Sequence, residues 1–139
     1  MREEDLHKLI VQWLQCALPE DALLHHSPNE GMRRPQYGRK LRALGLRPGW
    51  PDLELLIPPS RFHDPCDWAP VFMEIKSATG RATGTQIETQ RALRTCGAHV
   101  EEVRSIDDVQ EFLGKLVPLK TKGRAHMLKQ LEEAKRGAA

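Results

Sequence analysis

Residues 71–103 have the pattern of a strand, a helix and a second strand in immediate succession. Val71 to Ser77 is an apolar run typical of a buried strand, and Ala82 to Cys96 has the spacing of a helix. Gly97 ends that helix in a left-handed conformation, and Ala98 to Val103 forms the next strand. Because a helical crossover normally joins neighbouring parallel strands, this passage predicts a parallel pair within an α/β fold.

The rest of the chain adds elements on both sides of this unit. Apolar residues at helical spacing predict a helix over residues 3–17 that ends before Pro19, and Asp52 to Ile57 reads as a strand. A final helix begins at the Ser105 cap and runs to about Leu116. The remaining segments are a loop or short edge strand at 25–31, a short basic helix at 37–44 and a surface loop at 60–70. This order predicts a small mixed β-sheet flanked by helices, with a functional site at the strand ends near its middle.

The length of 139 residues fits one domain, and 40% hydrophobic with 29% charged residues fit a globular protein. We expect the domain to span residues 1–117 and a basic tail, able to form a helix, to span 118–139. No apolar run approaches the roughly 18 residues of a membrane span, and no signal segment is evident at the N-terminus. Three scattered cysteines read as reduced thiols, which predicts a cytoplasmic location without membrane attachment.

The positive charge of the chain is concentrated in one segment. Between Gly31 and Pro51 there are six cations and no acid, although the net charge is only +2. Such segregation favours a polyanionic partner, with ordinary solvated side chains as the alternative. We expect five of these cations to contact phosphates: Arg33, Arg34, Arg39, Lys40 and Arg42.

Two short segments carry the residues most suited to chemistry. Asp52 follows a Gly-Trp-Pro turn, and Glu74 and Lys76 flank Ile75 at the end of the second apolar run. Side chains alternate along a strand, so Glu74 and Lys76 point to one face while Ile75 points into the core. Two carboxylates beside an ammonium could bind one divalent cation and activate one water, which is the chemistry of phosphodiester hydrolysis. A structural Glu–Lys ion pair is the alternative.

Together, Pro51-Asp52, Glu74-Ile75-Lys76 and Gln86 resemble the PD-(D/E)XK nuclease superfamily, and within it the VRR-NUC domain. The supporting string is Pro28-Asn29-Glu30-Gly31, then Lys40 to Asp52, then Met73 to Ser77, with Gly80 and Gly97 following in order. The resemblance covers roughly Arg2 to Leu116 and implies a core like that of restriction endonucleases.

The resemblance also implies a role for each matched residue. Asp52 and Glu74 would ligate Mg²⁺ or Mn²⁺ with the backbone carbonyl of Ile75. Lys76 would hold and help deprotonate the attacking water, or neutralise charge on the phosphate, and Gln86 would orient Lys76 or that water.

In this family an acidic residue on the first helix usually completes the group of metal-binding and catalytic residues. Glu3 is the matching position, because Leu6 and His7 follow at the expected offsets, and Glu4 is the competitor. An acid at a helix N-terminus also interacts favourably with the helix dipole, so a purely structural role for Glu3 remains open.

Small stand-alone VRR-NUC proteins resemble Holliday-junction resolvases and act as homodimers. The resemblance therefore implies a metal-dependent, structure-selective DNA endonuclease of phage or bacterial origin that cleaves four-way junctions as a homodimer. The alternatives are a flap or restriction-type nuclease on the same fold, a non-catalytic DNA-binding module and an interaction subunit of a repair assembly.

Overall fold

The computed structural model describes residues 1–27, 35–120, 129 and 132–137. Its helices are α1 (Glu3–Ala17), α2 (Pro35–Ala43), α3 (Gly84–Thr95) and α4 (Ile106–Gly114), and its strands are β1 (Leu23–His26), β2 (Leu53–Leu56), β3 (Val71–Ile75) and β4 (His99–Val103). Two short 3₁₀ turns, η2 (Pro59–Arg61) and η3 (Pro65–Asp67), lie in the loop between β2 and β3. The predicted order of elements is confirmed. The edge strand β1 shares only His25 and His26 with the predicted 25–31 segment, and residues 28–31 lie outside the described residues.

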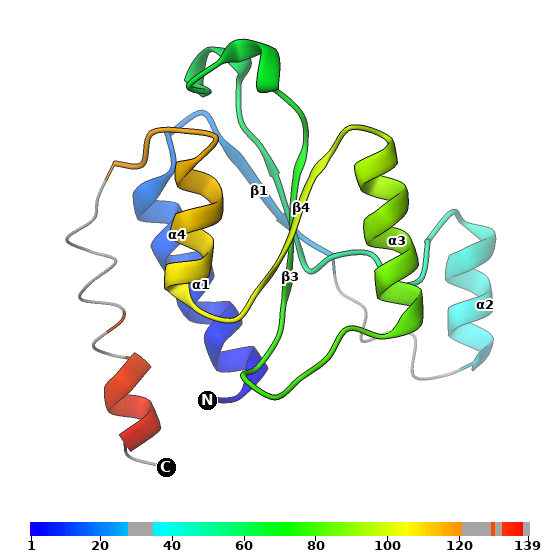
Figure 1. Ribbon diagram of the computed structural model, residues 1–139. Helices are drawn as coiled ribbons and strands as arrows, with labels where there is room; N and C mark the ends of the chain where they lie inside the picture. The colour runs from blue at the N-terminus through cyan, green and yellow to red at the C-terminus, as the bar shows by residue number, and fades with distance from the viewer. Residues whose placement is uncertain (28–34, 121–128, 130–131, 138–139) are drawn as a thin grey trace.

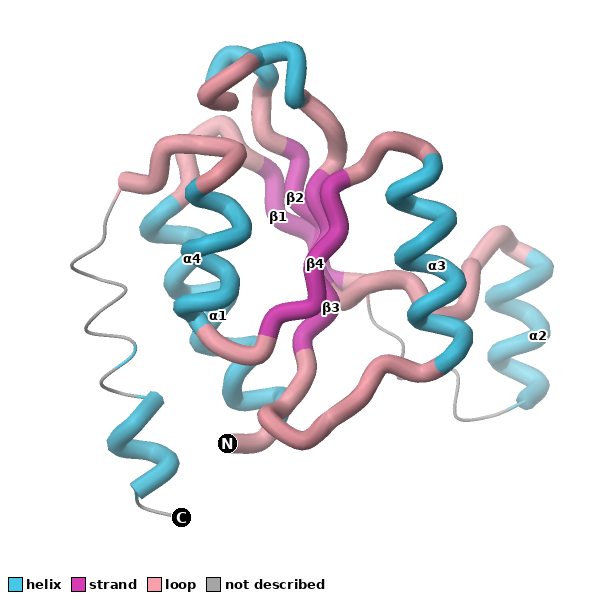
Figure 2. Tube along the Cα trace, viewed as in Figure 1, coloured by secondary structure: helices cyan, strands magenta, loops and turns pink. Residues whose placement is uncertain are grey.

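The four strands form one mixed sheet in the order β1-β2-β3-β4 (Figure 2). β1 pairs with β2 and β2 with β3 in antiparallel fashion, whereas β3 pairs with β4 in parallel. The parallel pair predicted from residues 71–103 is therefore confirmed. Helices α1 and α4 cover one face of the sheet, and α3 covers the other, with α2 beyond α3 (Figure 1).

The main core lies between the sheet and the pair α1 and α4. Helix α1 turns a stripe of apolar side chains inward, and Ile10, Trp13 and Leu14 are fully buried. Met73 and Ile75 of β3 enter the same core, whereas Phe72 packs on the opposite face with Leu93 of α3. Glu74 shares the Phe72 face because side chains alternate along a strand, so a carboxylate is carried into the layer beneath α3.

Capping residues set the helix boundaries more tightly than the apolar pattern predicts. Helix α3 begins at Gly84 rather than Ala82, because the Thr83 hydroxyl accepts a hydrogen bond from the N–H of Gln86. Gly97 follows the helix with a φ of 93°, which confirms the predicted left-handed end. At the start of α4, the Ser105 hydroxyl accepts from the N–H of Asp108.

The chain beyond the expected domain limit at residue 117 still packs on the fold. Leu119 contacts the main core, and the N–H of Lys120 donates to the carbonyl of Ala17. The residues expected to line an apolar face of a tail helix, Met127, Leu128 and Leu131, lie outside the described residues, although 132–137 are helical. Across the described part of the chain, no helix has the length and apolar character that a membrane crossing needs.

Candidate active site

The Asp52 side chain is hydrogen-bonded to the backbone at the end of β3. Its Oδ2 atom accepts a hydrogen bond of 2.8 Å from the N–H of Ile75. The antiparallel register pairs Leu53 with Met73, so continuing it by two residues places Pro51 opposite Ile75. Since proline has no N–H, Pro51 cannot return a ladder bond to the Ile75 carbonyl. The Pro51-Asp52 dipeptide therefore replaces a ladder bond with a carboxylate contact and leaves that carbonyl without a donor from β2.

Glu74 and Lys76 lie together at the end of β3 and are both buried, with 2% and 8% of their surfaces exposed. The Lys76 ammonium is 3.6 Å from Oε1 of Glu74. The same Oε1 accepts a hydrogen bond of 2.9 Å from the side-chain amide of Gln86, whereas Oε2 is buried and has no hydrogen-bond partner among the residues that the structure describes. An unpartnered buried carboxylate oxygen is costly, so Oε2 is available to bind a cation when Glu74 is ionised, or to share a proton with the Asp52 carboxylate when Glu74 is protonated.

Gln86 joins the start of α3 to this carboxylate. Its side-chain oxygen accepts from the N–H of Thr83 at 2.9 Å, and the Thr83 hydroxyl accepts from the Gln86 N–H at 3.2 Å. This reciprocal capping box fixes the Gln86 amide, whose nitrogen is then aimed at Glu74. The bonded partner is Glu74, whereas the resemblance implies that Gln86 orients Lys76 or the attacking water.

The electrostatics of Glu74 are unusual for a carboxylic acid. Burial raises the pKa of Glu74 from 4.5 to about 8, and repulsion by the Asp52 carboxylate adds to the rise. The Lys76 ammonium opposes this shift but does not cancel it. Without a cation at the site, Glu74 therefore keeps its proton at neutral pH. A divalent ion would favour the ionised form, because its charge compensates for both burial and the Asp52 carboxylate.

This pKa shift predicts how stability depends on pH when metal is removed. The folded protein holds the Glu74 proton up to pH of about 8, whereas the unfolded chain releases it near 4.5. More protons are bound by the folded state in this window, so the free energy of unfolding should fall as pH rises through it, by an amount on the order of a few kcal/mol. Urea unfolding in chelator, between pH 5 and 8.5, measures the effect.

Glu74→Gln is the matched control, because it removes the titrating proton while preserving the shape of the side chain. The difference in unfolding free energy between the parent and Glu74→Gln should narrow towards acid pH and widen towards alkaline pH, with the parent less stable there. Parallel curves for the two proteins would contradict the raised pKa.

The residues at the strand ends fit a divalent cation. Asp52, Glu74 and the Ile75 carbonyl offer hard oxygen donors, which suit Mg²⁺ or Mn²⁺ better than softer metals. The unpartnered Oε2 of Glu74 supplies a free ligand atom. Within the described ranges, no group of three or more His, Cys, Asp or Glu side chains is close enough to hold a metal ion. Backbone and water oxygens would therefore have to complete the coordination.

The first helix contributes one acid to the neighbourhood of the site. The charge of Glu3 helps to raise the pKa of Glu74, and its Oε2 lies 3.7 Å from the point where a Cβ on Gly80 would be. Glu4 instead forms an exposed ion pair with Lys8 at 3.3 Å. The geometry thus favours Glu3 over Glu4 as the helix acid near Glu74.

The expected phosphate-binding cations are only partly described. Arg39, Lys40 and Arg42 are exposed on α2, and none of them has an ion-pair partner among the residues that the structure describes. Arg33 and Arg34 lie outside the described residues. Helix α2, which carries these three cations, lies beyond α3 relative to the sheet (Figure 1).

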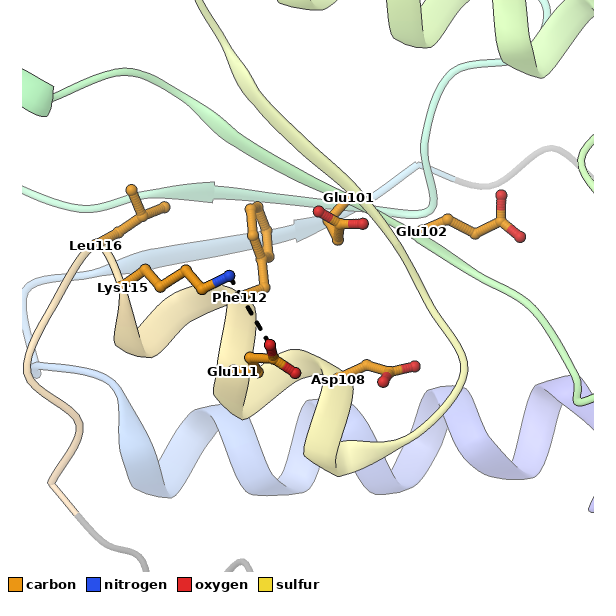
Figure 3. Close-up of a pocket in the computed structure, with 7 residues that line it drawn as sticks. All are labelled: Glu101, Glu102, Asp108, Glu111, Phe112, Lys115 and Leu116. Atoms are coloured by element: carbon orange, nitrogen blue, oxygen red, sulfur yellow. Dashed lines mark ion pairs between the residues drawn. The ribbon is translucent and has the colours of Figure 1, made fainter.

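A second concentration of acids lies along the free edge of β4. It borders a hollow of about 410 Å³ between β4 and α4, where Lys115 pairs with Glu111 (Figure 3). The hollow is lined by Glu101, Glu102, Asp108, Glu111, Phe112, Lys115 and Leu116. Its negative charge disfavours contact with a polyanion on this side of the molecule.

Sequence reasoning missed the contact that brings the Asp52 segment against α3. Gly49 has a φ of 76°, and a Cβ at this position would lie 2.7 Å from the carbonyl oxygen of Thr85. Only glycine permits this approach of two backbones without strain. The available signal is the glycine two residues before Pro51, which by its sequence pattern predicts only a turn.

Comparisons with known proteins agree with this arrangement at the level of the fold. A scan against family models and a search of curated proteins gave no match. Among solved structures, a chain described as a VRR_NUC domain protein matches with a TM-score of 0.62 and 21% sequence identity. The match covers 83% of this chain and 87% of the other. This chain has the VRR_NUC fold.

The resemblance stated from the sequence motifs is thereby confirmed for the fold. The mixed four-stranded sheet with flanking helices is the architecture that the VRR_NUC fold and this chain have in common. At this level of identity the likeness concerns the arrangement of the backbone.

Proposed function

We propose that this protein is a metal-dependent endonuclease that hydrolyses phosphodiester bonds in DNA. The observation that carries the proposal is the convergence of Asp52, Glu74 and Lys76 at adjoining strand ends, with one buried oxygen of Glu74 unpartnered. The VRR_NUC fold supports the same reading. A site that only binds DNA gains nothing from carboxylates, because they repel the phosphate backbone.

Each residue has a role that its contacts support. Asp52 and Glu74, with the Ile75 carbonyl, would hold Mg²⁺ or Mn²⁺, which supplies positive charge to the scissile phosphate and acidifies a bound water. The Lys76 ammonium would hold the attacking water and take its proton, or neutralise charge on the phosphate. Gln86 keeps the Glu74 carboxylate in place through the capping box. Glu3 would bind a water at the margin of the site.

The preferred substrate is branched DNA, and four-way junctions in particular. The exposed cations of α2 offer phosphate contacts that carry no sequence information, and the acidic β4 edge excludes DNA from the other side. Such a surface recognises the shape of a duplex arrangement rather than its bases. A homodimer with two-fold symmetry would supply two sites for paired cuts in a symmetric junction.

Cleavage assays on matched substrates test the proposal. We expect cuts in a synthetic four-way junction with Mg²⁺ or Mn²⁺, slower cuts in a linear duplex of the same sequence, and none after addition of chelator. Equal cleavage rates on junction, flap and linear duplex would refute selectivity for DNA structure but would still support nuclease activity. Absence of cleavage on every substrate in both metals would refute the nuclease itself.

Binding at two salt concentrations separates the remaining alternatives. A non-catalytic DNA-binding module would bind the junction without cutting it, and its affinity would fall steeply with salt. An interaction subunit without a DNA surface would show neither cleavage nor salt-sensitive binding. Chain mass in solution, measured by light scattering, tests the homodimer.

A further inference from the structure

The loop between α2 and Asp52 is fastened to α3 by one buried hydroxyl. The Thr89 side chain, 1% exposed, donates to the carbonyl of Pro48 at 3.0 Å. The same oxygen accepts a hydrogen bond of 3.3 Å from Nε of Arg47. The hydroxyl thus acts both as a donor and as an acceptor, and its two partners are consecutive residues of one loop.

The contacts continue along the loop towards Asp52. Gly49 lies against the backbone of Thr85, where a Cβ would be only 2.7 Å from the carbonyl oxygen. The Trp50 ring meets the Phe72 ring edge to face, with centroids 5.4 Å apart. Arg47 to Trp50 therefore form an uninterrupted contact with the surfaces of α3 and β3, although the segment contains no helix or strand.

The position of this contact in the chain gives it a consequence for the site. Thr89 lies one helical turn after Gln86, which holds Glu74, and Pro48 lies a short distance before Asp52. The Thr89 hydroxyl therefore connects α3, whose Gln86 holds the Glu74 carboxylate, to the loop that leads to Asp52. The two carboxylates come from separate segments, because Asp52 precedes β2 whereas Glu74 lies in β3.

We infer that Thr89 is a positioning residue, which holds the Asp52 carboxylate against β3 in register with Glu74. It touches neither a reacting atom nor a metal ligand, and acts through the Pro48 carbonyl. The inference rests on the proposed nuclease function for its effect on cleavage, but the placement of Asp52 can be measured separately.

Thr89→Val tests the inference, because it keeps the shape of the side chain and removes the hydroxyl. We expect kcat for junction cleavage to fall about tenfold or more, with KM within about twofold of the parent. Thr89→Ser restores the hydroxyl and should recover the parent kcat. Thr95→Val is the matched control, because Thr95 lies on the exposed side of the same helix and its hydroxyl donates to the Arg91 carbonyl within that helix.

Hydrogen exchange supplies a measurement that does not depend on activity. The Ile75 amide donates to Asp52, so its exchange rate reports on the position of the carboxylate. We expect this amide to exchange about tenfold faster in Thr89→Val, with amides in α1 unchanged. Thr89→Ala, which admits water to the Pro48 carbonyl, is a second variant in case the valine disturbs packing, and the same acceleration is expected.

The inference would be overturned if Thr89→Val and Thr89→Ala both kept the kcat of the parent and its rate of Ile75 amide exchange. A rise in KM alone would also overturn it, because the loop would then serve substrate binding. If the parent protein cleaves no DNA, the proposed function fails, and the exchange of Ile75 alone decides whether Thr89 positions Asp52.

Discussion

Replacing Lys76 with methionine, or Asp52 with asparagine, should reduce DNA cleavage by about a thousandfold or more while the fold is retained. Methionine preserves the length of the lysine side chain but removes the ammonium 3.6 Å from Glu74. Asparagine can still accept the hydrogen bond from the Ile75 N–H, so only the charge at the proposed metal site is lost. Single-turnover cleavage of a labelled junction in Mg²⁺ measures both effects.

The two substitutions should act oppositely on the metal-free protein. The Asp52 carboxylate raises the pKa of Glu74, whereas the Lys76 ammonium lowers it. Asp52→Asn should therefore stabilise the fold at alkaline pH, and Lys76→Met should not. Enhanced stability together with lost activity in Asp52→Asn would identify a site whose charges serve function rather than folding.

Lys115→Met is the control for removal of a lysine from a Glu–Lys pair. Lys115 pairs with Glu111 at 3.8 Å on the exposed surface of α4, away from the strand ends. Its loss should leave cleavage unchanged, since exposed pairs contribute little. Substantial activity in Lys76→Met would reject the assigned site.

Gly49→Ala should be the most damaging small substitution in the loop before Asp52. A Cβ would lie 2.7 Å from the Thr85 oxygen and 2.9 Å from the Gln86 nitrogen, and both are backbone atoms of α3 that cannot rotate away. The φ of 76° adds strain for any residue with a Cβ. We expect a loss of about 2–4 kcal/mol in unfolding free energy and at least about tenfold in cleavage.

Gly97→Ala separates backbone strain from this close contact. Gly97 has a comparable φ of 93°, but nothing lies within 4 Å of the added Cβ. Its substitution should cost about 1 kcal/mol and leave cleavage unaffected. Urea unfolding and cleavage rates of the two variants provide the comparison. Equal losses of stability in Gly49→Ala and Gly97→Ala would mean that Gly49 is not in close contact with the backbone of α3.

The fold could be predicted from the sequence because its determinants are local. Apolar spacing defined α1 through Ile10 and Trp13, and Gly97 marked the end of α3. The succession of strand, helix and strand over residues 71–103 carried the parallel pairing. The antiparallel register of β1 and β2 was outside this reasoning, because it depends on pairing between segments separated by a long connection.

The sequence by itself determined which residues are candidates for chemistry, because side-chain alternation and motif order place Glu74 and Lys76 on one face next to Asp52. Only the tertiary structure decided how they are held. Three hydrogen bonds between residues of different segments hold them: Ile75 to Asp52, Gln86 to Glu74, and Thr89 to Pro48. The high pKa of Glu74 likewise arises from burial beneath α3 and from the Asp52 carboxylate, which belongs to the segment before β2. Desolvation and close approach are properties of the packed chain, so no local pattern encodes them.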